Sequence, residues 1–479
     1  MSFMAEEANN DDKVKVIEEC QVRPPSGSVL TTSIPLSYLD FPWFDCPLPL
    51  QKPIFFYDFP YSTQHFLQTV LPILKHSLSL TLQHFFPLAA NIVLPPKPHT
   101  PHILYSKGDF ISLTVAESTI DFNHLVSNSP RHVTHAHPFV PLLPPSRVLE
   151  DGTLMMPSMA IQVTVFPNFG FSLCLTFRHV IADARSFMHF MKFWALVCKT
   201  KGDLALVEAS LCLPFHYRGM IEDPNGLRPI FLEELWNNLD STSYQVDEDD
   251  ASRDIVRHIF TFKRQQVEKF KKWTAFKCKS IGLEILHLST FVVISSLMWV
   301  CMVKSEDMKL DTVPDDEYCS MNFVADCRNL YELSIPSNYF GNCLTKCNVE
   351  IQRSKLVGEN GVFEAVNVIG RGIRNMRGNP LKGVDSLMTS LSKRELGEKL
   401  ENVVRMAGST KLNVYETDFG WGKPKMGEVL HLDHNLKVMC LCDSREQECA
   451  VEVGLVLKEI QMEKFTTILE EQLRDIVLD

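Results

Sequence analysis

Two strand-like segments that share a turn and run into an amphipathic helix are the feature that most restricts the fold of this chain. Apolar and polar residues alternate over 171–178, which predicts a half-buried strand, and residues 160–166 form a second strand pattern. The sequence Pro-Asn-Phe-Gly at 167–170 joins them and has the composition of a hairpin turn. Apolar residues then recur at helical spacing at Phe187, Phe190, Met191 and Trp194. This order indicates a layered core of strands and helices.

A single His-x-x-x-Asp motif, His179 to Asp183, stands where this strand meets the helix. The chain has 16 histidines, so the spacing alone is weak evidence and the context carries the argument. His179 falls in phase with the apolar face of the strand, and Asp183 stands where a helix N-cap is expected. An imidazole held against apolar surface stays neutral near pH 7 and can accept a proton. The strand and helix leave two alternatives about equal: a general base, or a core histidine bonded to a backbone carbonyl with Asp183 as an ordinary cap.

Length, charge and cysteine content limit the class of protein. A chain of 479 residues exceeds what one core usually supports, so two domains are expected. The net charge of -11 argues against a nucleic-acid partner. The 14 cysteines form no Cys-x-x-Cys pair and no zinc-like group, and the polar start of the chain has no signal-peptide core, so a reduced, cytoplasmic location is predicted.

Two further segments have a second possible interpretation. Residues 285–303 carry no formal charge and are long enough to cross a bilayer, but serines, a threonine and a histidine interrupt them, so a buried helix is predicted and no membrane insertion is expected. The three histidines His132, His135 and His137 could suggest a metal site. Their neighbours include four prolines and no carboxylate or cysteine completes a ligand set, so an exposed loop without metal is predicted.

The pattern along the chain divides it into an N-terminal domain at 1–215, a crossover linker at 216–254 and a C-terminal domain at 255–479. The linker is predicted from a run of Ser, Asp and Glu between 240 and 254. Strands are predicted at 14–22, 255–262, 318–325, 437–441 and 450–457, and helices at 66–82, 265–276, 290–303, 361–376, 393–406 and 462–477. Strands and helices mix without a repeat or regular alternation, which favours an α/β or α+β architecture over a doubly wound Rossmann fold.

Three further segments resemble the motifs of one family, the BAHD acyl-CoA-dependent acyltransferases of plants. Asp-Phe-Gly-Trp-Gly at 418–422 resembles the second signature of that family and follows the histidine motif in the family's order. Asn-Tyr-Phe-Gly-Asn-Cys at 338–343 resembles the motif of the branch that acts on anthocyanins and other flavonoid glycosides, and Asp-Cys-Arg at 326–328 resembles the segment whose arginine pairs with the motif aspartate. The resemblance covers nearly the whole chain.

This resemblance implies two similar α/β domains related to chloramphenicol acetyltransferase, with an active-site channel between them. His179 would act as the general base on a sugar hydroxyl that attacks the thioester of acyl-CoA, and no covalent acyl-enzyme is implied. Asp183 would be structural, turned from the channel and paired with Arg328. Asp418, mainly structural, would belong to a turn that shapes the channel, and that turn also contains Gly420, Trp421 and Gly422.

A basic segment opens the second domain and is a candidate site for the phosphates of coenzyme A. A solvated helix face is the more common explanation of such a run. Hydroxyls just before a helix favour anions, however, and the family places coenzyme A in this region. The predicted acyl-CoA-binding residues are Lys271, Lys272, Ser289 and Thr290, with Ser409 as a further candidate for orienting the acyl carbonyl.

The resulting hypothesis is an O-acyltransferase that moves a hydroxycinnamoyl or malonyl group from coenzyme A to an anthocyanin or flavonoid glycoside. Its partners would be these two small molecules, with coenzyme A thioester as a co-substrate and no bound cofactor, and the family suggests a monomer. Two alternatives remain. One is the same chemistry on another alcohol, phenol, terpenoid or amine, and the other is a catalytically silent relative that binds metabolites or partners.

Overall fold

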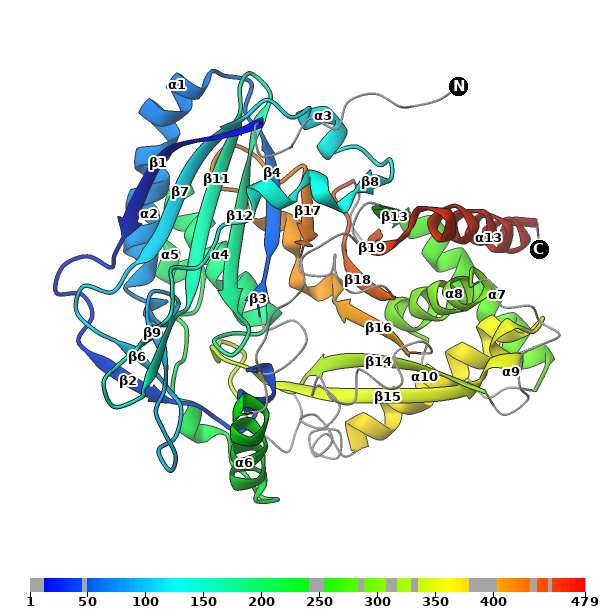
Figure 1. The fold of residues 1–479 in the computed structure, drawn as a ribbon. Coiled ribbons are helices and arrows are strands. Elements are labelled where there is room, and N and C mark those ends of the chain that lie inside the picture. Colours follow the sequence, from blue (N-terminus) through cyan, green and yellow to red (C-terminus); the bar gives the residue numbers. More distant parts are fainter. Residues whose placement is uncertain are drawn as a thin grey trace.

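The computed structural model describes residues 13–44, 50–240, 254–282, 288–306, 317–328, 335–378, 403–430, 437–446 and 450–478. Three β-sheets organise these residues: two of seven strands and one of five (Figure 1). The predicted mixture of strands and helices in both halves of the chain is confirmed.

The first seven-stranded sheet contains the predicted hairpin. Its strands, in spatial order, are β1 (Val14–Val22), β7 (Ile111–Ser118), β11 (Met159–Phe166), β12 (Gly170–Arg178), β4 (Pro53–Asp58) and β17 (Met426–Val429), with β3 (Leu50–Gln51) also paired to β12. The turn between β11 and β12 requires Gly170, because a Cβ there would lie 2.4 Å from the carbonyl oxygen of Tyr57 and from the ring of Phe122. From this hairpin, β12 runs to the turn that carries His179.

The expectation that 171–178 is half-buried is wrong, because both faces of β12 are covered. Leu173 and Leu175 belong to the core beneath the helices, whereas Cys174 belongs to a second cluster with Phe122 and Phe139. Helices α2 (Leu71–Leu82) and α4 (Ala184–Lys199) contribute to the first of these cores. Period-2 alternation reports which face carries the larger apolar groups, but not whether the other face is exposed.

The remaining helices of the N-terminal half are short, except for the one that follows the first domain. They are α1 (Thr63–His65), which continues through a π-helical turn η3 (Phe66–Val70) into α2, then α3 (Phe122–Leu125), α5 (Leu204–Ser210) and α6 (Leu227–Asp240). The predicted helix at 66–82 is therefore confirmed, with a π turn in it. Helix α6 occupies part of the predicted linker, and residues 241–253 lie outside the described residues.

A small sheet lies beside the first one and a large sheet forms the C-terminal half (Figure 1). The small sheet orders β2 (Thr32–Pro35), β6 (His102–Tyr105), β5 (Asn91–Leu94), β10 (Leu154–Pro157) and β9 (Arg147–Val148). The large one orders β15 (Leu344–Gln352), β14 (Tyr318–Asp326), β16 (Val403–Gly408), β18 (Val438–Asp443), β19 (Val451–Lys458), β13 (Ile255–Phe262) and β8 (Arg131–His132). Its helices are α7 (Arg264–Ser280), α8 (Thr290–Lys304), α9 (Arg353–Val357), α10 (Gly361–Gly378) and α13 (Glu459–Leu478).

Helix α8 is the centre of the C-terminal core. Helices α7, α9, α10 and α13 all contact it, and every residue from Val292 to Val303 is buried. Uniform burial explains why this segment is apolar on all sides. Among the described residues, no helix combines the length and apolar character needed to cross a membrane.

Two strands cross between the halves of the chain. Strand β17 pairs with β4 in the N-terminal sheet, and β8 pairs with β13 in the C-terminal sheet. The pairing of β8 also places His132 in a strand, although a loop was predicted there. One of the two edge strands of each large sheet thus comes from the other half of the chain, which links the two sheets.

The helix predicted at 393–406 is wrong where the structure describes it, because β16 begins at Val403 and pairs in parallel with β14 and β18. Residues 393–402 lie outside the described residues. The strand β16 leads directly to Ser409, which lies at the cavity described below.

Candidate active site

The His-x-x-x-Asp motif forms a tight turn between β12 and α4. Ile181 N donates to Arg178 O at 3.0 Å, and Ala182 N donates to His179 O at 3.2 Å. Asp183 is the N-cap of α4, as predicted, and its Oδ1 accepts from Ser186 N at 2.9 Å. The cap satisfies one of the free amides at the start of the helix and fixes the direction in which α4 leaves the turn.

His179 lies at the wall of a cavity of about 690 Å³. Trp43, at the end of the 3-10 turn η2 (Phe41–Trp43), stacks on the imidazole with ring centroids 3.8 Å apart. His179 Nδ1 lies 3.1 Å from Asn342 Oδ1. Burial lowers the pKa of His179 to about 4, so the imidazole is neutral at physiological pH. This is the protonation state that a general base requires.

Asp183 forms a buried, bidentate ion pair with Arg328, the partner that the resemblance implied. Arg328 Nη1 lies 2.8 Å from Asp183 Oδ2, and Nη2 donates to Oδ1 at 3.0 Å. Burial disfavours the charged guanidinium, but Asp183 and Asp326 outweigh it and raise the pKa of Arg328. Asp183 is not among the residues that line the cavity. The carboxylate therefore holds the turn and does not face the reacting groups.

The segment 339–343 packs against the start of α4 through main-chain contacts. Arg328 Nη2 donates to Gly341 O at 3.0 Å, and Cys343 N donates to Asp183 Oδ2 at 3.0 Å. Asn342, in the same segment, makes the contact to His179 already given. The segment 338–343, whose sequence resembles the motif of one branch of the family, therefore contacts the histidine at Nδ1.

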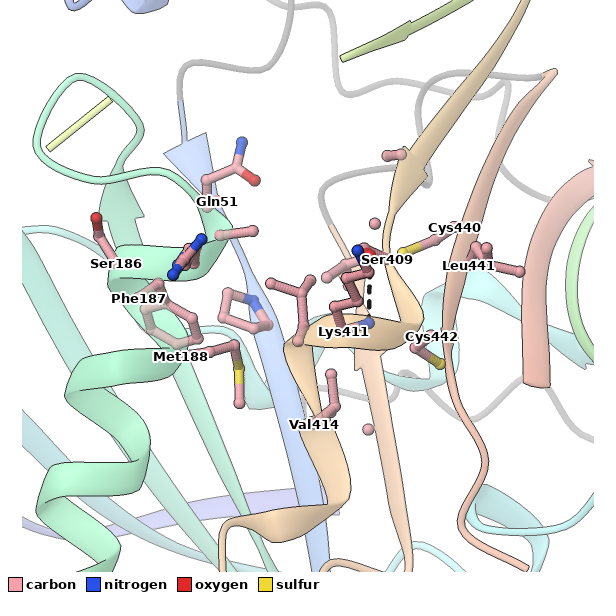
Figure 2. A pocket seen from close by; sticks show the side chains of 18 of the residues that line it. Gln51, Ser186, Phe187, Met188, Ser409, Lys411, Val414, Cys440, Leu441 and Cys442 are labelled. Atoms are coloured by element: carbon pink, nitrogen blue, oxygen red, sulfur yellow. Dashed lines mark hydrogen bonds between the residues drawn. The ribbon is translucent and has the colours of Figure 1, made fainter. Parts of the chain in front are cut away.

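The cavity lies between the two large sheets. On one side Figure 2 shows Gln51, which lies on β3, and Ser186, Phe187 and Met188 on α4. On the other side it shows residues of the C-terminal half, namely Ser409, Lys411, Val414, Cys440, Leu441 and Cys442. The predicted interdomain position of the site is thus where the structure places His179. Most of the cavity lining is apolar. Three of its cationic side chains pair with carboxylates: Arg185 with Asp326 at 2.5 Å, Lys192 with Glu416 at 3.0 Å and Arg257 with Glu428 at 3.6 Å.

The predicted acyl-CoA-binding residues fall into two groups. Ser409 lines the cavity with His179, and its Oγ accepts from Lys411 N at 3.2 Å (Figure 2). The four others do not line it. Lys271 pairs with Glu268 on α7, and Ser289 caps α8 by accepting from Val292 N at 3.3 Å. The remaining two, Lys272 and Thr290, lie on these same helices.

The second signature motif is a turn outside the cavity wall. Asp418 Oδ1 accepts from Gly420 N at 2.8 Å and from Gly422 N at 2.9 Å, while Oδ2 accepts from Lys199 at 2.7 Å. Gly420 and Gly422 have φ of +107° and +104°, which favours glycine at both positions. Trp421 stacks on Phe419, which packs on Trp194. The turn anchors the C-terminal end of α4 through Lys199, whereas His179 precedes the N-terminal end of that helix. Its part in shaping the channel stays a prediction.

Three residues that support the histidine were not predicted from the sequence: Trp43, Asp40 and Arg218. Asp40 accepts from Asn342 Nδ2 at 3.0 Å and pairs with Arg218 at 2.7 Å. No local pattern marks these residues, because the contacts of Asp40 with Asn342 and Arg218, and of Trp43 with His179, join segments more than a hundred residues apart. Among the described residues, no group of His, Cys, Asp and Glu is arranged to hold a metal ion.

Comparison with known proteins places this site in a family. Residues 12–472 match the model of the Transferase family. The chain is 35% identical to the coumaroyl-CoA:anthocyanidin 3-O-glucoside-6''-O-coumaroyltransferase 1 of Arabidopsis thaliana, over 96% of this chain and 97% of that protein. It is 34% identical to the malonyl-coenzyme A:anthocyanin 3-O-glucoside-6''-O-malonyltransferase of Dahlia pinnata, over 98% and 99%.

Solved structures share the fold at low sequence identity. Vinorine synthase aligns with a TM-score of 0.67 at 16% identity, over 94% of this chain and 96% of that one. TRI101 of F. sporotrichioides, complexed with coenzyme A and T-2, aligns with a TM-score of 0.63 at 14% identity, over 91% and 97%. These alignments confirm the predicted α/β class with two chloramphenicol-acetyltransferase-like domains. By its family match and full-length relatives, the chain belongs to the Transferase family, that of the BAHD acyl-CoA-dependent acyltransferases which its motifs resemble.

Proposed function

We propose that this protein transfers a hydroxycinnamoyl or malonyl group from a coenzyme A thioester to a sugar hydroxyl of an anthocyanin or another flavonoid glycoside. One observation carries the proposal: a neutral histidine, bonded through Nδ1, lies at the wall of an interdomain cavity. The chain that builds it is 35% and 34% identical to a coumaroyltransferase and a malonyltransferase of anthocyanin glucosides.

In the proposed reaction, His179 takes the proton of the sugar hydroxyl as its oxygen attacks the thioester carbonyl. The carbon–sulfur bond then breaks, and the thiolate of coenzyme A leaves and receives a proton. The imidazole is suited to this step because its pKa is lowered to about 4 by burial and its Nδ1 is already engaged. The mainly apolar lining of the cavity also limits hydrolysis of the thioester by water.

The other predicted residues take supporting parts in this proposal. Asp183 and Arg328 hold the histidine turn, and the turn of Asp418 holds the far end of α4. Ser409 orients the acyl carbonyl from the opposite wall. Contacts to the phosphates of coenzyme A are proposed for Lys271, Lys272, Ser289 and Thr290.

We further propose that the protein acts as a cytoplasmic monomer on two small-molecule substrates, with coenzyme A thioester as co-substrate and no resident cofactor. The boundaries at 215 and 254 remain a proposal for the division into domains. The exchange of β8 and β17 between the large sheets supports treating the two halves as one cooperative unit.

The test is release of coenzyme A thiol by the purified protein with cyanidin 3-glucoside and, in parallel, p-coumaroyl-CoA and malonyl-CoA. Glycoside-dependent release with one donor, lost in His179→Ala and retained in the matched surface variant His99→Ala, would establish the reaction and the acyl class. His99 is exposed and outside the cavity wall. Absence of release with both donors would overturn the proposed acceptor class.

A further inference from the structure

The side-chain amide of Asn342 has one orientation that satisfies its surroundings. Its Nδ2 lies 3.0 Å from Asp40 Oδ1, 3.0 Å from His179 O and 3.2 Å from Val180 O. All three atoms are hydrogen-bond acceptors, so only the amide NH₂ can face them. The reverse orientation would turn an oxygen toward two carbonyls and a carboxylate in a site where Asn342 is fully buried. Oδ1 is therefore the atom that faces His179.

This orientation determines which imidazole nitrogen carries the proton. Asn342 Oδ1, 3.1 Å from His179 Nδ1, can only accept, so Nδ1 must donate. A neutral imidazole with its proton on Nδ1 has its lone pair on Nε2. The nitrogen left free for chemistry is the basic one.

A buried ion pair holds the amide in turn. Asp40 and Arg218 lie 2.7 Å apart with side chains 0% and 2% exposed. Asp40 Oδ2 also accepts from Ser37 N and Ser37 Oγ at 2.8 Å each. Arg218 donates to Ile181 O at 2.6 Å, within the histidine turn. Arg218, Asp40 and Asn342 thus form a continuous chain of polar contacts that begins and ends on the turn 179–182.

We propose that Asn342, oriented by Asp40 and Arg218, is the positioning residue that holds His179 in its Nδ1–H tautomer and thereby leaves Nε2 as the catalytic base. This inference rests on the proposed role of His179. Asn342 touches no reacting atom and acts through the imidazole. The Asp183–Arg328 pair fixes where the turn lies, whereas Asn342 fixes which nitrogen of the ring is basic.

The direct test is nitrogen NMR of the intact protein labelled with ¹⁵N-histidine, with the His179 signals assigned by their loss in His179→Gln. The expected result near pH 7 is a protonated Nδ1 and an unprotonated Nε2. An imidazole populated mainly with its proton on Nε2 would overturn the inference. Because this measurement needs no substrate, it stands even where the proposed reaction is not observed.

Two variants at one position separate positioning from folding. Asn342→Leu keeps the approximate size but removes the acceptor, whereas Asn342→Asp, in its protonated form beside Asp40, restores a carbonyl oxygen facing Nδ1. We expect Asn342→Leu to lower kcat by about 10- to 100-fold with KM changed less than about twofold, and Asn342→Asp to recover part of kcat. Asn348→Ala, at an exposed position of the edge strand β15, is the control. Equal kcat in Asn342→Leu and the native protein, or equal losses in both variants with the native tautomer retained, would contradict the inference.

Discussion

Trp43 lies flat against the imidazole of His179, with ring centroids 3.8 Å apart and an angle of 8° between the ring planes. The short helix that ends at Trp43 has Asp40 as its N-cap residue, and Asp40 holds Asn342. One local element therefore supports the histidine on a ring face and, through the amide, on Nδ1. These contacts hold the ring in place, and no hydrogen bond from the turn occupies Nε2, the remaining nitrogen.

Replacing Trp43 separates stacking from other support of the histidine. Trp43→Ala removes the surface that fixes the ring plane, so we expect kcat to fall by about 100-fold, since a displacement of about 1 Å at a reacting group has that effect. Trp43→Phe retains a stacking face and should keep most of kcat. Steady-state kinetics with denaturant unfolding of each variant is the measurement. Unchanged kcat in a folded Trp43→Ala variant would contradict this role.

The Asp183–Arg328 pair should matter mainly for stability. Asp183→Ala leaves a guanidinium that is 0% exposed without its bidentate partner, so we expect the free energy of unfolding to fall by about 3–5 kcal/mol. The double variant Asp183→Ala/Arg328→Met also removes the buried guanidinium, whose other carboxylate partner is Asp326 at 2.9 Å, and should recover part of that loss. His179→Ala, by contrast, should abolish activity with little change in stability. Urea unfolding of the four proteins tests this, and a fully stable, inactive Asp183→Ala would argue for a chemical role.

The local order of elements could be predicted from the sequence, because it depends on short-range pattern. The limits of β1 and β13 and the N-cap role of Asp183 follow from neighbouring residues and agree with the structure. The second covered face of β12 could not be predicted, since it is formed by Phe122 and Phe139 from distant segments. The prediction of a helix at 403–406 was wrong for a related reason. Its pairing with β14 and β18 decides its conformation, and short apolar runs fit either period.

The residues of the site also fall into those that the sequence predicted and those that it did not. His179 and Ser409 line the same cavity, and Asp183 is paired with Arg328 away from it, the pair that the resemblance implied. Asn342 meets His179 across 163 positions of sequence, and its role depends on contacts that no single-sequence pattern encodes. For the basic run on α7, the sequence identifies a charged helix face, and Lys271 on that face is paired with Glu268. Its contact with coenzyme A stays a prediction, because a lysine cluster does not by itself identify a ligand.

The low pKa of His179 predicts the pH dependence of the reaction. Burial lowers that pKa from 6.5 to about 4, so the base is unprotonated at all pH values well above 4. We therefore expect kcat/KM to be flat from about pH 6 to about pH 8 and to fall only as the pH approaches the lowered pKa. Initial rates across this range, with circular dichroism to exclude acid unfolding, provide the check. An acidic limb centred near 6.5 would show that the free imidazole is not desolvated.

Gly454 offers a steric probe of the cavity that leaves the catalytic residues intact. It lies in β19 opposite Cys440, lines the cavity and is not in the left-handed region. A Cβ added there would have its nearest neighbour, Cys440 O, at 3.9 Å, so a β-carbon fits at this position in ordinary van der Waals contact.

Gly454→Val should therefore fold normally and occupy space that substrate would use. Valine suits a strand better than glycine, so the free energy of unfolding should change by less than about 1 kcal/mol. Where the cavity holds the acyl group, kcat/KM should fall more for p-coumaroyl-CoA than for malonyl-CoA, because the larger acyl group loses the room it needs. Gly378→Val, at the exposed end of α10, is the matched control. An equal fall for both donors would place the lost space on the acceptor side instead, and no fall for either would show that this part of the cavity is not occupied during turnover.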